Sequence, residues 1–211
     1  MNRRELLQMI ATLTGGAVIG SEFFLSGCTN STAVAEEFSK ETIALLDEIG
    51  ETILPATSSP GAKAAGVGSF MKRYVTDCYS AEDRKIFLDG LQQLNADSEK
   101  KNGKSFMDAS PDQRKELLLA LEPIAREVQA KRGKAYMDHV TEVRSKGNLY
   151  PIVGFVNPVP VHYYTQVKQL TLLGFFTSEP GATQALRYKA VPTHYEGALD
   201  YHKGDKAWAE N

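Results

Sequence analysis

The feature that most constrains the fold is a set of helix-start signals in the middle of the chain. Ser39, Ser80 and Ser110 each precede a run of apolar residues spaced three and four apart. Ser110 gives the clearest signal, because Pro111 and Gln113 complete a first-turn proline and a capping box. No alternating pattern typical of strands accompanies these runs. We therefore expect a mainly α fold, a single helical domain.

Each predicted helix has one apolar stripe and a defined limit. Pro55 ends the first helix, and Pro123 predicts a kink or a break in the third, because proline has no amide donor. The polar stretch from Glu127 to Lys146 predicts a helix exposed along much of its length. The expected stripes are Leu46, Ile49 and Ile53; Phe87, Leu91 and Leu94; and Leu117, Leu118, Leu121 and Ile124.

The last third of the chain differs in composition, since it holds most of the prolines and more than half of the aromatic residues. Closely spaced prolines predict an extended segment over 150–160. A helix is expected from about Val161 to Thr177, and beyond Leu186 an extended tail runs through Pro192 to Trp208. In that helix Tyr164, Val167, Leu170 and Gly174 have helical spacing, Leu170, Leu173 and Phe176 are assigned to the core, and Gly174 is assigned to a close approach of another backbone.

The first residues have the pattern of an export signal. Arg3 and Arg4 precede a modest apolar stretch that ends at Leu25-Ser26-Gly27-Cys28. Glycines and Glu22 interrupt this stretch, so a cleaved signal is favoured over a permanent membrane span. We expect residues 1–27 to be a twin-arginine lipoprotein signal peptide, a route that exports folded proteins. Residues 28–37 would then be the lipidated Cys28 with a flexible tether, and 38–211 the helical domain.

This reading places the protein in a bacterial cell envelope, lipid-anchored on the periplasmic side. Thr29 after the acylated cysteine favours the outer membrane. The net charge of −2 gives no electrostatic field for nucleic acid and no polybasic patch for a membrane. Cys78 has no cysteine to pair with once Cys28 is acylated, so we expect it to be a buried small apolar residue, with a reactive thiol as the alternative.

Motifs for catalysis or cofactor binding do not emerge from the chain. The Gly61–Gly68 loop lacks the lysine and hydroxyl of a phosphate loop and is interpreted as a flexible helix-to-helix connector. The histidines occur singly, although the segment from His194 to His202 could bind a cation together with neighbouring acidic residues. We therefore expect no catalytic, cofactor-binding or metal-binding residues in this chain.

The aromatic tail is the best candidate for binding a protein partner. Tyrosine, tryptophan and arginine are enriched at interface hot spots because they offer large contacts at low entropic cost. The predicted docking surface is Ser178–Tyr188 with the tail to Trp208. Its candidate residues, together with two on the preceding helix, are Tyr164, Phe175, Glu179, Arg187, Tyr188, Tyr195 and Trp208.

Three blocks of the chain resemble one known family. They are Leu170–Tyr188 (LTLLGFFTSEPGATQALRY), Leu46–Thr57 with the following glycine loop, and Val191–Gly197 with the ending near Trp208. In these blocks the chain resembles the gluconate 2-dehydrogenase subunit 3 family. The resemblance implies a small, cofactor-free accessory subunit of a flavin-dependent dehydrogenase of sugars, polyols or glycosides.

What the resemblance implies for partners is specific. The large subunit in such complexes is a glucose-methanol-choline (GMC) oxidoreductase that carries FAD, and electrons pass on to a cytochrome. The small subunit's twin-arginine peptide would export both chains, and Cys28 would make this subunit the membrane anchor. Two alternatives remain open at this point. One is a stand-alone envelope enzyme or metal-binding lipoprotein using His194–His202, and the other is a solute-binding or structural lipoprotein without a redox partner.

Overall fold

The computed structural model describes residues 38–147, 150, 154–191, 193 and 197–209. Internal contacts divide the chain into Met1–Ser39 and Lys40–Asn211, and the second unit is the one described below. The predicted signal peptide, Arg3, Arg4, Cys28 and the tether lie outside the described residues. The elements of the second unit are α3 (Lys40–Ile53), α4 (Val67–Cys78), α5 (Ala81–Asn102), α6 (Pro111–Ser145), α7 (Tyr163–Phe176) and the π-helical turn η2 (Gly181–Ala185).

The helix starts follow the predicted capping signals. The Ser80 hydroxyl accepts from the Asp83 amide at 3.1 Å and so caps α5. Ser110 and Gln113 form a reciprocal capping box at the start of α6, with amide-to-side-chain distances of 3.3 and 2.9 Å. Each cap satisfies amides that have no partner within the helix. The mainly helical fold predicted from sequence is therefore confirmed, and no β-strand occurs in the part of the chain that the structure describes.

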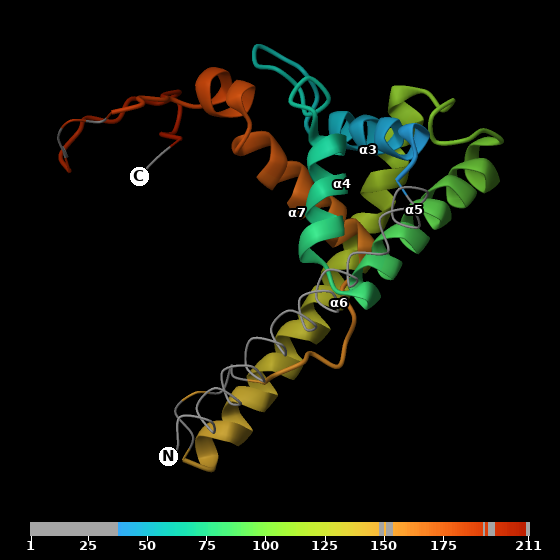
Figure 1. The fold of residues 1–211 in the computed structure, drawn as a ribbon, viewed down its shortest axis with the longest axis vertical. Coiled ribbons are helices and arrows are strands. Elements are labelled where there is room, and N and C mark those ends of the chain that lie inside the picture. The colour runs from blue at the N-terminus through green and yellow to red at the C-terminus, as the bar shows by residue number, and fades with distance from the viewer. Residues whose placement is uncertain (1–37, 148–149, 151–153, 192, 194–196, 210–211) are drawn as a thin grey trace, which may run out of the picture. The chain divides into compact units, whose positions relative to one another are not determined.

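The central element is α7, which packs against α3, α4, α5 and α6 (Figure 1). Two close approaches let it do so. A Cβ atom added at Gly90 of α5 would lie 2.1 Å from the Tyr163 ring, and one added at Gly174 would lie 2.6 Å from the Phe70 ring. Gly174 is thus required by an aromatic side chain, not by the backbone contact expected for it. The buried core includes Leu46, Ile49, Val67, Met71, Val75, Phe87, Leu94, Leu117, Leu121, Val167 and Leu170.

Helix α4 is an element that the sequence signals did not reveal. It begins after Gly66, which has a left-handed φ of 67° and makes no side-chain cap. Glycine adopts this conformation without the strain that a Cβ atom would cause. The buried Val67, Met71 and Val75 place α4 against α3 and α7. Without a capping residue, the only sequence signal for α4 was the four-residue spacing of these apolar residues.

The sequence-based expectations for α6 hold only in part. The helix continues through Pro123 without the break that was considered, and its stretch from Glu127 onward is mostly exposed, as predicted. Ile124 was assigned to the core but is exposed. The buried residues in this half of the helix are Leu117, Leu118, Leu121 and Ala125. Because successive residues are about 100° apart around the helix axis, the centre of the face that these four residues form does not coincide with Ile124.

The segment that follows α6 is non-helical over 154–160, as its prolines predict. It is fastened to α6 at several points. The Asn157 amide donates to the Arg132 carbonyl at 3.0 Å, and the Arg132 guanidinium donates to the carbonyl of Val159. The Phe155 ring stacks on His139 with centroids 4.5 Å apart. Among the described helices, none is both long and apolar enough to cross a membrane.

Candidate partner-binding surface

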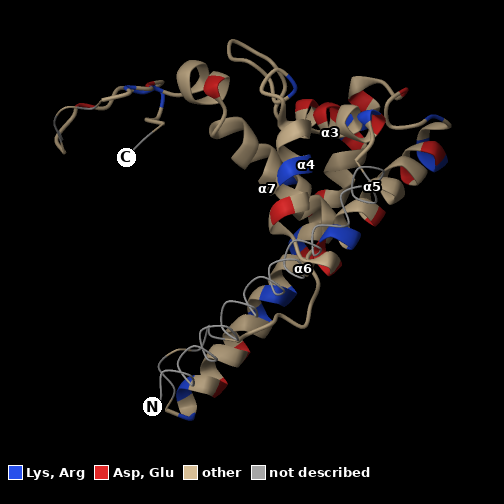
Figure 2. Ribbon diagram, in the orientation of Figure 1, with Lys and Arg blue, Asp and Glu red and all other residues tan. Residues whose placement is uncertain are grey.

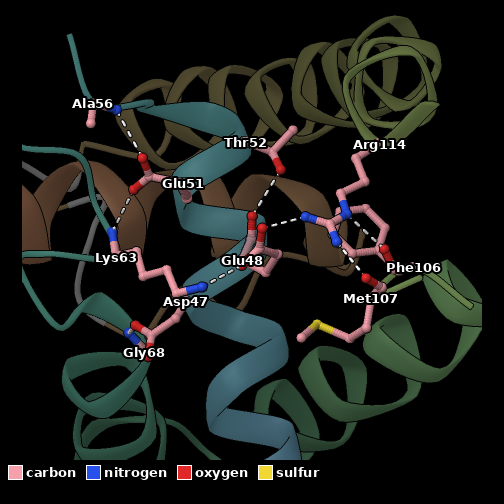
Figure 3. A network of polar contacts seen from close by, with 10 residues as sticks. All are labelled: Asp47, Glu48, Glu51, Thr52, Ala56, Lys63, Gly68, Phe106, Met107 and Arg114. Atoms are coloured by element: carbon pink, nitrogen blue, oxygen red, sulfur yellow. Dashed lines mark hydrogen bonds and ion pairs between the residues drawn. The ribbon is translucent and has the colours of Figure 1, made fainter. Parts of the chain in front are cut away.

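A network of polar contacts surrounds the second half of α3 (Figure 3). One oxygen of the Glu48 carboxylate accepts a hydrogen bond from the Lys63 ammonium at 2.7 Å, and the other oxygen accepts one from the Arg114 guanidinium. The hydrogen bond from Lys63 is the main reason that the pKa of Glu48 lies below its usual value, and the charge of Arg114 adds to the effect. Arg114 also donates to the carbonyls of Phe106 and Met107, so it fastens α3, α6 and the preceding loop together.

The same cluster holds the connector between α3 and α4. Glu51 accepts from the amides of Ala56 and Lys63 at 2.8 and 2.9 Å, and Asp47 accepts from the Gly68 amide at 2.7 Å. The glycine loop is therefore a helix-to-helix connector, as interpreted from sequence. It is pinned by three carboxylates, however, and is not the flexible segment that was expected. These acidic residues serve backbone amides and cations, a structural role.

Metal and cofactor ligands are limited in the part of the chain that the structure covers. No group of three or more His, Cys, Asp or Glu residues there could hold a metal ion. His202 is exposed and lies 3.8 Å from the Asp205 carboxylate. His194, which completes the cation-binding alternative, lies outside the described residues.

Cys78 is exposed at the end of α4, so the expectation of a buried cysteine is wrong. Cys78 follows Met71 by seven residues and so lies on nearly the same side of α4, but it is the last residue of the helix.

Two predicted docking residues on α7 belong to the core. Tyr164 and Phe175 are 6% and 4% exposed, so their side chains offer little surface to a partner. Burial is also the main reason that the pKa of Tyr164 rises to about 12. Conversely, Leu173 and Phe176, assigned to the core from sequence, are exposed. The predicted and observed faces of α7 are therefore interchanged at its end. The core-facing residues there include Thr171, whose polar side chain gave no apolar signal in the sequence.

A sharp turn links α7 to the tail. The Ser178 hydroxyl donates to the Phe175 carbonyl at 2.6 Å and accepts from the Gly181 amide at 3.1 Å. A Cβ atom at Gly181 would lie 1.8 Å from the Phe175 carbonyl oxygen, so only glycine fits. This turn starts η2 and leaves Glu179 exposed.

The described residues of the tail after η2 form no helix, as predicted, and the tail returns on itself. Arg187 and Trp208 form an isolated parallel bridge, with the Arg187 amide donating to the Ala207 carbonyl at 2.8 Å and the Ala209 amide donating to the Arg187 carbonyl at 2.7 Å. The guanidinium of Arg187 lies over the Trp208 ring, 5.1 Å from its centroid. We call residues 187–209 the tail loop, and the contacts at its closing point the Arg187 clasp.

Further polar contacts complete the Arg187 clasp. Arg187 Nε donates to the Lys206 carbonyl at 2.6 Å, and its terminal nitrogen lies 3.3 Å from the Asp205 carboxylate. The Lys206 ammonium donates to the Gln184 carbonyl in η2. Asp205 and Lys206 were not singled out from sequence, because their partners lie about twenty residues away, beyond any local motif.

The described part of the tail loop exposes large apolar side chains. Tyr188 and Trp208, two of the predicted docking residues, are exposed, and Tyr195 lies outside the described residues. The clasp itself holds Arg187 half-buried. Exposed aromatic groups on an irregular segment are typical of protein-binding surfaces. The exposed large apolar residues of the tail loop are Tyr188, Val191, Leu199, Tyr201 and Trp208.

The fold and this surface define a class: a small helical protein whose α7 and C-terminal loop present uncovered apolar side chains, as subunits of larger assemblies do. Comparison with protein families makes the assignment particular. Residues 40–193 match the model of gluconate 2-dehydrogenase subunit 3, and the chain belongs to that family. Searches of curated proteins and of solved structures gave no significant match. The resemblance seen in the sequence is thereby confirmed.

Proposed function

We propose that this chain is the non-catalytic small subunit of an FAD-dependent dehydrogenase complex that acts on sugars, polyols or glycosides. The observation that carries the proposal is the match of residues 40–193 to subunit 3 of gluconate 2-dehydrogenase. The partner is a large subunit of the GMC type that carries the FAD, and a cytochrome c receives the electrons. The chain itself contributes no catalytic residue and no cofactor.

The proposed contact uses the tail. Its exposed aromatic groups at Tyr188 and Trp208 have an apolar body and a polar edge, which suits an interface that forms after both chains fold. The Arg187 clasp reduces the conformational freedom of the loop and so lowers the entropy lost on binding. Glu179 at the turn adds a charged group at the edge of this surface.

The proposed cellular role combines export and anchoring. Arg3 and Arg4 direct the folded complex through the twin-arginine route, and the acylated Cys28 holds it on the periplasmic side of the membrane. Two or more acyl chains bind stably, since each buried CH₂ contributes about 0.8 kcal/mol. The large subunit needs no signal of its own in this scheme.

The central experiment is purification of the tagged full chain from its native host, followed by measurement of bound FAD and of dye-linked sugar oxidation. We expect a flavin-containing partner in comparable molar amount. A tagged chain that carries no flavoprotein, or that oxidises sugars or binds metal alone, would contradict the proposal.

Export and anchoring are tested separately. Replacing Arg3 and Arg4 by lysine should keep both subunits in the cytoplasm, whereas Cys28→Ala should release an intact complex from the membrane. Fractionation followed by immunoblotting of both chains distinguishes the two outcomes. If the large subunit still reaches the periplasm without the arginine pair, the co-export role is wrong.

A further inference from the structure

Helix α7 has an unusual lack of charge for a helix that reaches the surface (Figure 2). Lys168 is the only charged residue between Tyr163 and Phe176, and its ammonium lies 2.7 and 2.8 Å from the two oxygens of Glu122 on α6. The hydrogen bond from Lys168 is the main reason that the pKa of Glu122 lies below its usual value. Both charges are thus engaged with each other, and the rest of α7 faces its surroundings with uncharged side chains.

The outward face of α7 carries a stripe of large apolar residues. Phe176 follows Leu172 by four residues and Leu173 by three, and the side chains of Leu172, Leu173 and Phe176 are 37%, 41% and 41% exposed. The opposite face is already buried against the other helices. A helix whose last turns are apolar on the outward face as well as on the buried face is typical of an element covered by a further protein surface. We call these three residues the α7 stripe.

The α7 stripe continues into a groove between α6 and α7. This groove has a volume of about 280 Å³, and Leu172 lies at the point where groove and stripe meet. On the α6 side its lining includes Ala125, Arg126 and Gln129. A groove beside exposed leucine and phenylalanine side chains gives a partner a place for an anchoring side chain.

The charge at this groove is not balanced. Glu122 is already satisfied by Lys168, and the Arg126 guanidinium reaches it only through one long contact of 3.5 Å. The Arg126 side chain is 79% exposed, and no other interaction of it occurs among the described residues. Two cations therefore face one carboxylate, which leaves an excess positive charge with unused donors. The complementary surface has an apolar centre and a carboxylate opposite Arg126.

We propose that the α7 stripe and the α6–α7 groove form a second docking surface, distinct from the tail loop, for the flavin-carrying subunit. This inference rests on the proposed function. It names the contacts of that subunit: an apolar patch on the α7 stripe and an acidic side chain against Arg126. The stripe supplies most of the affinity by excluding water, and Arg126 fixes orientation and association rate.

The test compares variants of the tagged full chain purified from the native host, with FAD per tagged chain as the readout. Leu173→Ser combined with Phe176→Ser, and separately Arg126→Glu, should each weaken capture of the flavoprotein about tenfold, which corresponds to about 1.4 kcal/mol. Raising the salt concentration should weaken the wild-type complex but partly restore binding by Arg126→Glu, because salt screens the repulsion between the new carboxylate and that of the partner. Circular dichroism melting verifies that each variant is folded.

Matched controls use α6 away from the groove. Met137→Ser replaces an exposed apolar residue and Arg144→Glu an exposed cation, and both should retain flavoprotein at the wild-type level. If the wild-type chain captures no flavoprotein, the proposed function fails. If the wild type and the stripe variants capture it equally, the docking inference alone fails. Size-exclusion chromatography that shows a wild-type dimer dissociated by the stripe substitutions would also overturn it, in favour of a second copy.

Discussion

Arg114 on α6 donates a hydrogen bond to Glu48 on α3, across 66 residues of sequence, with both side chains largely buried. The same guanidinium donates to the carbonyls of Phe106 and Met107. One arginine therefore fixes the relation of two helices and the loop before α6. A side chain with several acceptors is more costly to remove than a single ion pair, because each acceptor loses its donor in a partly buried site.

We predict that Arg114→Met lowers the free energy of unfolding by about 3 kcal/mol, since it leaves the Glu48 charge partly buried beside Lys63 alone. Glu48→Gln should cost less, about 1 kcal/mol, because an amide still accepts one hydrogen bond and Arg114 keeps its two carbonyls. Urea denaturation followed by circular dichroism measures both. Lys85→Met, at the exposed Lys85–Asp89 pair, is the control and should change stability by less than about 0.5 kcal/mol. Equal effects of Arg114→Met and Lys85→Met would refute the role of this cluster.

Two glycines give a matched pair for the packing of α7. Gly90→Ala should destabilise the protein by about 2 kcal/mol, because the added methyl group meets the Tyr163 ring, which is itself held in the helical core. Gly133→Ala, in α6, meets no atom within 4 Å and should stabilise by about 1 kcal/mol through helix propensity alone. Thermal melting of both variants checks the prediction. Similar shifts of the same sign would show that Tyr163 moves aside.

The sequence was sufficient for the parts of the fold that depend on local chemistry. Ser80 and Ser110 act as caps because each accepts from an amide three residues ahead, a relation visible in the sequence. Helix α4 was not predicted because the residue before it, Gly66, ends the connector through its backbone conformation. Glycine has no side chain that could mark the start of a helix in the sequence. The close contact of Gly90 with Tyr163 could not be predicted, since it depends on how two distant helices cross.

The candidate surface shows the same division. An aromatic tail suited to docking was visible in composition, but its closure at Arg187 was not, because Trp208 is far away in sequence. The orientation of α7 was predicted wrongly at Phe175 and Phe176, which are adjacent and chemically identical. Only the packing against Phe70 and the other helices decides which of the two is buried.

The start of α7 gives the protein a pH-sensitive cap. His162 Nδ1 accepts from the Tyr164 amide at 3.2 Å, which requires the unprotonated nitrogen, and burial lowers the pKa of His162 below 6.5. Because the folded-state pKa lies below the unfolded value, this group favours the folded state above about pH 6.5, and the advantage is lost as the pH falls through the folded-state pKa. A protonated imidazole would also oppose the positive end of the helix dipole.

We therefore predict that His162→Asn, which keeps a capping acceptor without titrating there, reduces the loss of stability on acidification. His162→Ala should be less stable than wild type by about 1 kcal/mol at neutral pH, because it leaves the Tyr164 amide uncapped. Urea unfolding of the three proteins at several pH values between 5 and 8 tests this. Parallel curves for wild type and His162→Asn would show that this imidazole does not contribute to the pH dependence.

The Arg187 clasp is expected to control the order of the tail loop without supporting the core. Arg187→Ala removes the contacts with the Lys206 carbonyl, Asp205 and the Trp208 ring, whereas Trp208→Ala removes only the stacked ring. An exposed cation–π contact contributes about 0.5–1 kcal/mol, so Trp208→Ala should raise amide exchange at Ala209 about threefold and Arg187→Ala should raise it further. The melting temperatures of both variants should match that of the wild type, because the clasp contacts join the tail loop to η2 and to itself and not to the helical core. Hydrogen exchange read by mass spectrometry measures the loop directly, with Tyr201→Ala as a control that leaves the clasp intact. A fall in melting temperature with unchanged exchange at Ala209 would mean that Arg187 stabilises the helical body and does not hold the loop closed.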